Sequence, residues 1–91
     1  MHLQPGIEET APAPATLQVF HRRLKIPLNV YLDTVREFPD PWDERAMQYF
    51  VEGYLREQND PGIVGMVREE KEPDWVYLDA AVRYPQIAVQ S

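Results

Sequence analysis

The sequence predicts a mainly α-helical fold, a small single-domain bundle of three to four short helices. Three observations favour it. Apolar residues recur at three- and four-residue steps, Asp-Pro pairs stand where helices would begin, and residues 71–85 echo residues 25–39. Alternating apolar residues near both termini add a minor two-stranded pairing of the N- and C-terminal segments.

The echo is an internal repeat with the pattern K-x-P-x-x-V-Y-L-D-x-x-x-x-[FY]-P in both copies. Helical spacing gives each copy an apolar stripe. In the first copy the stripe is Leu24, Leu28, Tyr31, Val35 and Phe38, and in the second it is Tyr77, Ala81 and Tyr84, with Trp75, Leu78 and Val82 on another face. Each copy is therefore predicted to be one helix of about three turns that stops at its final proline. Duplication, or two helices that converged on similar packing residues, would both explain the match.

The chain divides into a flexible proline-rich arm, residues 1–16, and a single helical domain, residues 17–91. Residues 17–25 are expected to form a short strand or an irregular entry. A helix follows from about Pro27, because proline is well tolerated at the first helical position.

The best-supported element is a helix capped by Asp40, starting at Pro41 and ending at about Gln58. Its apolar residues form two rows, which are Trp42, Ala46, Phe50 and Tyr54, and Met47, Val51 and Leu55. A short helix is expected over residues 61–69, and residues 68–74 are expected to form a charged connector loop before the second repeat copy. Residues 86–91 alternate like a strand and could pair with residues 17–20.

Composition limits the classes of function. The chain has 91 residues, 15 acidic against 9 basic, a net charge of −6 and no cysteine. The acidic balance argues against direct nucleic-acid binding and against anionic membranes, and suggests a partner protein with a basic surface. The absence of cysteine excludes disulfides and cysteine-ligated metals. Neither a signal peptide nor a transmembrane run is present, so cytoplasmic residence is expected.

Catalytic motifs are missing. Ser91 is the only serine and His2 and His21 are the only histidines, so no nucleophile–base arrangement can be assembled. No glycine-rich phosphate loop and no metal-ligand spacing occurs. The sequence therefore predicts no enzyme, no cofactor and no metal.

Aromatic residues suggest the partner-binding surface, because Trp and Tyr dominate interface hot spots. Trp42, Tyr31 and Tyr54 lie on apolar stripes and are expected in the core. The partner-binding candidates lie on the second repeat helix, together with the aspartate matched between the copies. They are Trp75, Tyr77, Asp79, Tyr84 and Asp33.

These observations predict a small acidic non-enzymatic protein–protein interaction module, acting as an accessory or regulatory subunit or as an adaptor. Two alternatives remain. One is an acidic inhibitor of nucleic-acid-handling machinery, encoded by a mobile element. The other is a homo-oligomeric structural component whose repeat helices pair between chains.

Overall fold

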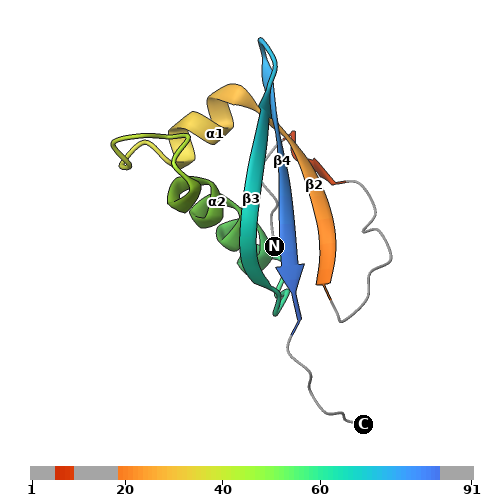
Figure 1. The fold of residues 1–91 in the computed structure, drawn as a ribbon. Coiled ribbons are helices and arrows are strands. Elements are labelled where there is room, and N and C mark those ends of the chain that lie inside the picture. The colour runs from red at the N-terminus through yellow and green to blue at the C-terminus, as the bar shows by residue number, and fades with distance from the viewer. Residues whose placement is uncertain (1–5, 10–18, 85–91) are drawn as a thin grey trace, which may run out of the picture.

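A computed structural model describes residues 6–9 and 19–84, which fold into one antiparallel sheet and two helices (Figure 1). The elements follow the order β1 (Glu8–Glu9), β2 (Val19–Pro27), α1 (Leu28–Thr34), α2 (Glu44–Glu57), β3 (Ile63–Lys71) and β4 (Trp75–Arg83). The strands lie side by side in the order β1-β2-β4-β3, and every neighbouring pair is antiparallel. Both helices lie on the same side of the sheet (Figure 1).

The core lies between this sheet and the two helices. Successive side chains of a strand point to opposite faces, so every second residue of β4 points towards the helices. Those residues are Val76, Leu78, Ala80 and Val82, each at most 1% exposed. Leu24 and Ile26 of β2 join them, and the helices contribute Tyr31, Val35, Ala46, Met47, Phe50, Val51, Tyr54 and Leu55.

The predicted fold class is therefore wrong, because the described residues form a sheet with two helices and not a mainly helical bundle. The error lies in residues 61–85. Residues predicted as a short helix and a charged connector form β3 and the turn of a β3–β4 hairpin, which the Glu72 N–H closes by donating to the Trp75 carbonyl at 2.8 Å. A strand that is buried on one face and half-covered on the other is apolar nearly all round, as a buried helix is.

The internal repeat has two different structures. Its first copy contains α1, a two-turn helix that ends at Thr34, and its second copy is β4. The shared V-Y-L-D segment is helical at residues 30–33 and extended at residues 76–79. The copies thus share sequence without sharing conformation, which corrects the expectation of two equivalent helices.

The helix expected up to about Gln58 is confirmed as α2, although it begins at Glu44. Asp40 does not cap it. The Asp40 carboxylate accepts the backbone N–H of Trp42 at 2.9 Å and so fixes the turn before the helix. Both predicted apolar rows pack against the sheet, and the expected core positions of Tyr31, Tyr54 and Trp42 are confirmed, with Trp42 partly buried.

The strand expected within residues 17–25 is also confirmed, and it is longer than expected. β2 pairs along its whole length with β4, with Val19 opposite Arg83 and Pro27 opposite Trp75. The predicted partner of this segment, residues 86–91, lies outside the described residues, as does most of the N-terminal arm. Within that arm, Glu8 and Glu9 pair with Lys25 and Leu24 of β2.

β3 is an edge strand that α2 supports from one side. A bulge shifts its register between Val64 and Val67. Beside the bulge, the Gln48 side-chain amide donates to the Gly65 carbonyl at 2.7 Å, and the Glu44 carboxylate accepts the Val67 N–H at 3.3 Å. Two backbone groups that the bulge leaves without a strand partner are therefore bonded to the helix.

Two glycines should respond oppositely to replacement by alanine. A Cβ on Gly53 in α2 would meet no atom within 4 Å, so Gly53→Ala should stabilise the fold by roughly 0.4–1 kcal/mol through lower unfolded-state entropy. A Cβ on Gly62 would lie 2.3 Å from Val82 Cγ1, so Gly62→Ala should destabilise it by about 1–3 kcal/mol. Urea denaturation measures both changes, and equal effects of the two replacements would contradict this packing.

Candidate functional site

Among the described residues, no helix or strand lies on the second face of the sheet, which we call the open face (Figure 1). It consists of the outward-pointing side chains of β2, β4 and β3. They are Val19, His21, Arg23, Lys25, Trp75, Tyr77, Asp79, Ala81, Arg83, Ile63, Met66, Arg68 and Glu70. All of them are half-exposed or exposed. A face with this many apolar and aromatic groups left uncovered is a candidate contact surface.

Two aromatic rings lie on the central strand of this face, and each has a cation over it. Lys25 Nζ is 4.3 Å from the centre of the Trp75 ring, and the Arg23 guanidinium carbon is 4.4 Å from the centre of the Tyr77 ring. Cation–π contacts of this kind contribute about 0.5–1 kcal/mol at exposed sites. They hold both rings in place on the sheet.

Arg23 is also the centre of an ion-pair network. Its Nη1 donates to both carboxylate oxygens of Asp79, at 3.0 and 2.7 Å, and its Nη2 donates to Glu70 at 2.9 Å. The three residues come from β2, β4 and β3, so the network crosses the three long strands. All three are partly exposed, so its contribution to stability is small and its main effect is to fix side-chain positions.

The open face differs in charge from the rest of the chain. It carries four Lys or Arg side chains and two acidic ones, a net charge of +2 in a protein of net charge −6. The remaining residues therefore carry −8. Counting Glu8 of β1, beside Lys25 at the sheet's far edge, lowers the face to +1 and keeps its sign. The acidic composition thus belongs to the other surfaces of the molecule.

A hollow of about 450 Å³ lies on the open face over Ala81, and we call it the Ala81 hollow. His21 lies across from Ala81 on β2, and Met66 and Arg68 form the opposite wall on β3. Asp79 lies at one end. The small side chain of Ala81 on the central strand leaves this space between the larger side chains of its neighbours.

Tyr84, at the end of β4, belongs to a different cluster on the helix side of the sheet. At its centre is Arg22, which is 8% exposed. The guanidinium donates two bonds to Glu9, one of them at 2.8 Å, and Nη1 donates to Asp60 at 2.8 Å and to Tyr84 Oη at 2.6 Å. The Tyr54 hydroxyl donates to Glu9 at 2.8 Å. A buried arginine with two carboxylates and two phenols is a structural clasp whose polar groups are paired.

This Arg22 cluster shifts the pKa of its members. The hydrogen bond to Glu9 raises the pKa of Arg22 above its usual value, against the effect of burial. Burial, followed by the hydrogen bond to Glu9, raises the pKa of Tyr54 to about 12. Burial alone would raise the pKa of Asp60, but the hydrogen bonds from Arg22, the Gly62 N–H and Tyr84 outweigh it and hold that pKa below its usual value.

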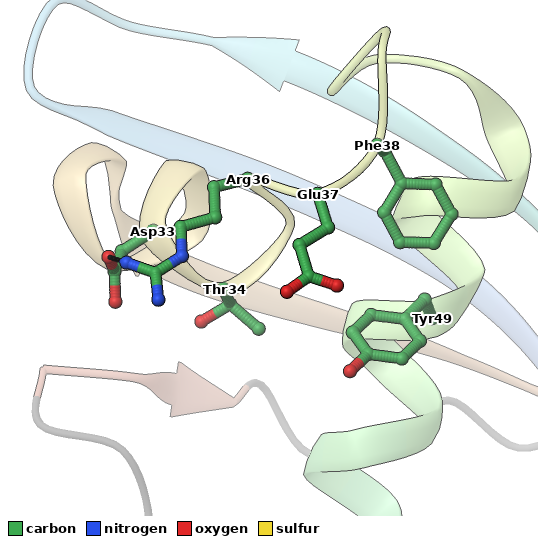
Figure 2. Close-up of a pocket in the computed structure, with 6 residues that line it drawn as sticks. All are labelled: Asp33, Thr34, Arg36, Glu37, Phe38 and Tyr49. Carbon is green, nitrogen blue, oxygen red and sulfur yellow. Dashed lines mark hydrogen bonds and ion pairs between the residues drawn. The ribbon is translucent and has the colours of Figure 1, made fainter.

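Asp33 lies on α1, in the helix layer and away from the open face. It lines a shallow hollow of about 440 Å³ together with Thr34, Arg36, Glu37, Phe38 and Tyr49 (Figure 2). Its carboxylate pairs with Arg36 at 3.2 Å, and both side chains are largely exposed. The Phe38 and Tyr49 rings lie side by side, 5.3 Å apart between centres. An exposed pair of this kind is weak, and nothing bound nearby identifies a ligand for the hollow.

The structure therefore separates the five partner-binding candidates. It brings Trp75, Tyr77 and Asp79 together, because residues two apart on a strand point to the same face. Tyr84 is in the Arg22 cluster, and Asp33 is in the α1 hollow. Whether any of them binds a partner stays a prediction.

Sequence reasoning missed His21, Met66 and Arg68 as neighbours of these candidates. The alternation of His21, Arg23 and Lys25 with buried residues of β2 was a usable signal, since a strand would place all three on one face. Their position beside Trp75 and Arg68 follows only from the pairing of β2 and β3 with β4.

Two further findings concern residues 6–9 and 19–84. Nowhere in them do three His, Asp or Glu side chains gather as a metal site would require. Their longest helix, α2, has 14 residues and is too short to cross a bilayer.

No protein-family model, no curated protein and no solved structure matches this chain. Function is therefore inferred from the site itself.

Replacing Asp60 by Asn should destabilise the fold at neutral pH by about 1–3 kcal/mol, because Arg22 loses one charged acceptor. Since the folded-state pKa of Asp60 is depressed, its contribution is full above the unfolded-state pKa of about 3.9 and is lost as pH falls through the lower folded value. The difference between wild type and Asp60→Asn should therefore shrink below about pH 4.

Urea denaturation at several pH values measures this difference. Glu52→Gln, at an exposed position of α2, removes the same charge outside the cluster and should leave stability nearly unchanged. A difference between wild type and Asp60→Asn that stays constant down to pH 2 would contradict the role given to Asp60.

Proposed function

We propose that this chain is a non-enzymatic protein-interaction module that binds a partner protein through the open face of its sheet. The observation that carries the proposal is the pairing of Trp75 and Tyr77 on the central strand of an uncovered face. Both rings are half-exposed and held by Lys25 and Arg23. Ordered aromatic side chains lose little conformational freedom on binding, so they are efficient anchors of an interface.

The charge of the open face determines the chemistry of the partner. A surface with a net charge of +2 is complementary to a surface with acidic and apolar residues. The basic partner expected from the composition followed from the net charge of the whole chain, whereas the contact surface has the opposite sign. The module would act as an accessory or regulatory subunit or an adaptor, and cytoplasmic residence remains part of the proposal.

Nucleic acid is a poorer occupant of this face. Binding to a phosphate backbone requires several unpaired cations, whereas Arg23 is bonded to two carboxylates. The rest of the molecule, with a charge of −8, would repel the remainder of a polyanion.

A second candidate function follows from the same distribution of charge. The surfaces outside the open face hold 13 of the 15 acidic residues, so they could occupy a basic groove on nucleic-acid-handling machinery. Such a complex should weaken steeply as salt rises, and a complex that tolerates 0.5 M salt would exclude it. Light scattering on the purified protein tests the homo-oligomeric alternative.

Trp75→Ala and Tyr77→Ala should each weaken partner binding by about 2 kcal/mol or more, with the fold retained, because both rings point away from the core. The partner would be captured from the native host, purified, and titrated against each variant. Hydrogen exchange of the complex should show protection on the open face.

Tyr49→Ala is the matched control, since Tyr49 is a 48% exposed tyrosine on α2, on the helix side of the sheet. It should bind as wild type does. Circular dichroism and thermal melting check folding. The proposal fails if both open-face variants unfold, or if they bind the partner as tightly as wild type.

A further inference from the structure

We propose that the Ala81 hollow is the part of the open face that takes the carboxylate of an acidic side chain of the partner. This inference rests on the proposed function and gives it a chemical specificity. Its walls come from β2 and β3, and its floor is the central strand, so the hollow is a feature of the whole sheet and not of one flexible loop.

The first reason is the state of Arg68. It lies opposite Asp79 in the register of β3 and β4, yet Asp79 is already bonded twice by Arg23. Within residues 6–9 and 19–84, the Arg68 side chain makes no hydrogen bond or ion pair, and it is exposed. Its guanidinium therefore presents a fork of N–H donors, which matches a carboxylate in a bidentate pair.

The second reason is the opposite wall. His21 is exposed and lies directly across β4 from Met66 and Arg68, beside Ala81. An imidazole N–H can donate to the same carboxylate that Arg68 binds. The small Ala81 leaves the depth that an incoming carboxylate needs between these two donors.

The third reason is the apolar rim. Met66 is 62% exposed and Ile63 is 45% exposed, and both belong to β3 on the same side of the hollow. Methionine adapts its shape to different apolar partners. The preferred occupant is therefore an aspartate or glutamate next to an apolar residue in the partner chain.

The surrounding charges favour a carboxylate over a phosphate group. Asp79 lies at the end of the hollow and Glu70 follows on β3, so a dianion would be repelled more strongly than a single negative charge. One unpaired arginine and a neutral histidine balance one carboxylate.

A random peptide library displayed on phage and selected against the purified full chain tests this inference. Selected peptides should be enriched in Asp or Glu next to an apolar residue. Titration of the isotope-labelled protein with one such synthetic peptide should shift the amide signals of His21, Arg68 and Ala81, as well as those of Trp75 and Tyr77.

Arg68→Gln should weaken binding of that peptide about tenfold, the typical effect of losing a charged hydrogen-bonded pair. Arg45→Gln removes the same charge from an exposed position on α2 and should leave affinity unchanged. Arg68→Glu should recover binding to a peptide whose acidic residue is replaced by Lys, which a purely structural role of Arg68 would not produce.

Failure of this inference and failure of the proposed function give different results. Peptides that shift Trp75 and Tyr77 but show no acidic preference, or that bind Arg68→Gln normally, overturn the acidic subsite and leave the open face as an interface. If no peptide binds the open face and Trp75→Ala does not affect the host partner, both are overturned.

Discussion

The pairing of β4 with β2 on one side and β3 on the other is the constraint on which the remaining structure depends. β4 is the only one of the three long strands with a long neighbour on both edges, and its alternate side chains supply both the core and the open face. A slip of one residue would exchange Val76 and Leu78 with Tyr77 and Asp79. The register is fixed by apolar burial on one face and by the Arg23–Asp79 pair on the other.

The Arg22 cluster ties the periphery to this central strand. Arg22 of β2 reaches Glu9 of β1, Asp60 in the loop before β3, and Tyr84 after β4, so four chain segments meet at one guanidinium. Taking a charge out of water costs several kcal/mol, and here two carboxylates and a phenol oxygen accept its hydrogen bonds. The cluster is specific because a partner of different geometry would leave a buried donor unpaired.

How much the sequence predicts varies along the chain. α2 was predictable because its two apolar rows have a helical period over four turns and lie behind a proline turn. β4 was not, since Trp75, Leu78 and Val82 fit a helical stripe although a strand puts Trp75 and Val82 on opposite faces. The V-Y-L-D segment, helical in α1 and extended in β4, shows that tertiary contacts outweigh local preference here.

The candidate site was predictable in part for the same reason. Trp75, Tyr77 and Asp79 were chosen on one element and do lie together, because any reading that keeps them on a single strand aligns them. Their neighbours His21 and Arg68 come from strands about 58 residues before and 11 residues before Asp79 in the chain, and strand register cannot be read from one sequence. Tyr84 and Asp33 were grouped with them by a helical stripe and a repeat that the fold does not follow.

The contacts of α2 with β3 have a consequence for how this protein behaves in a crowded solution. An exposed edge strand offers unpaired backbone groups on which another chain can extend the sheet, the first step of edge-to-edge aggregation. Here Gln48 and Glu44 occupy two of those groups at the bulge, and charged residues follow as far as Lys71. The helix therefore acts as a plug on the sheet's open rim, so that the molecule can expose sticky aromatic rings on one face without polymerising through its edge.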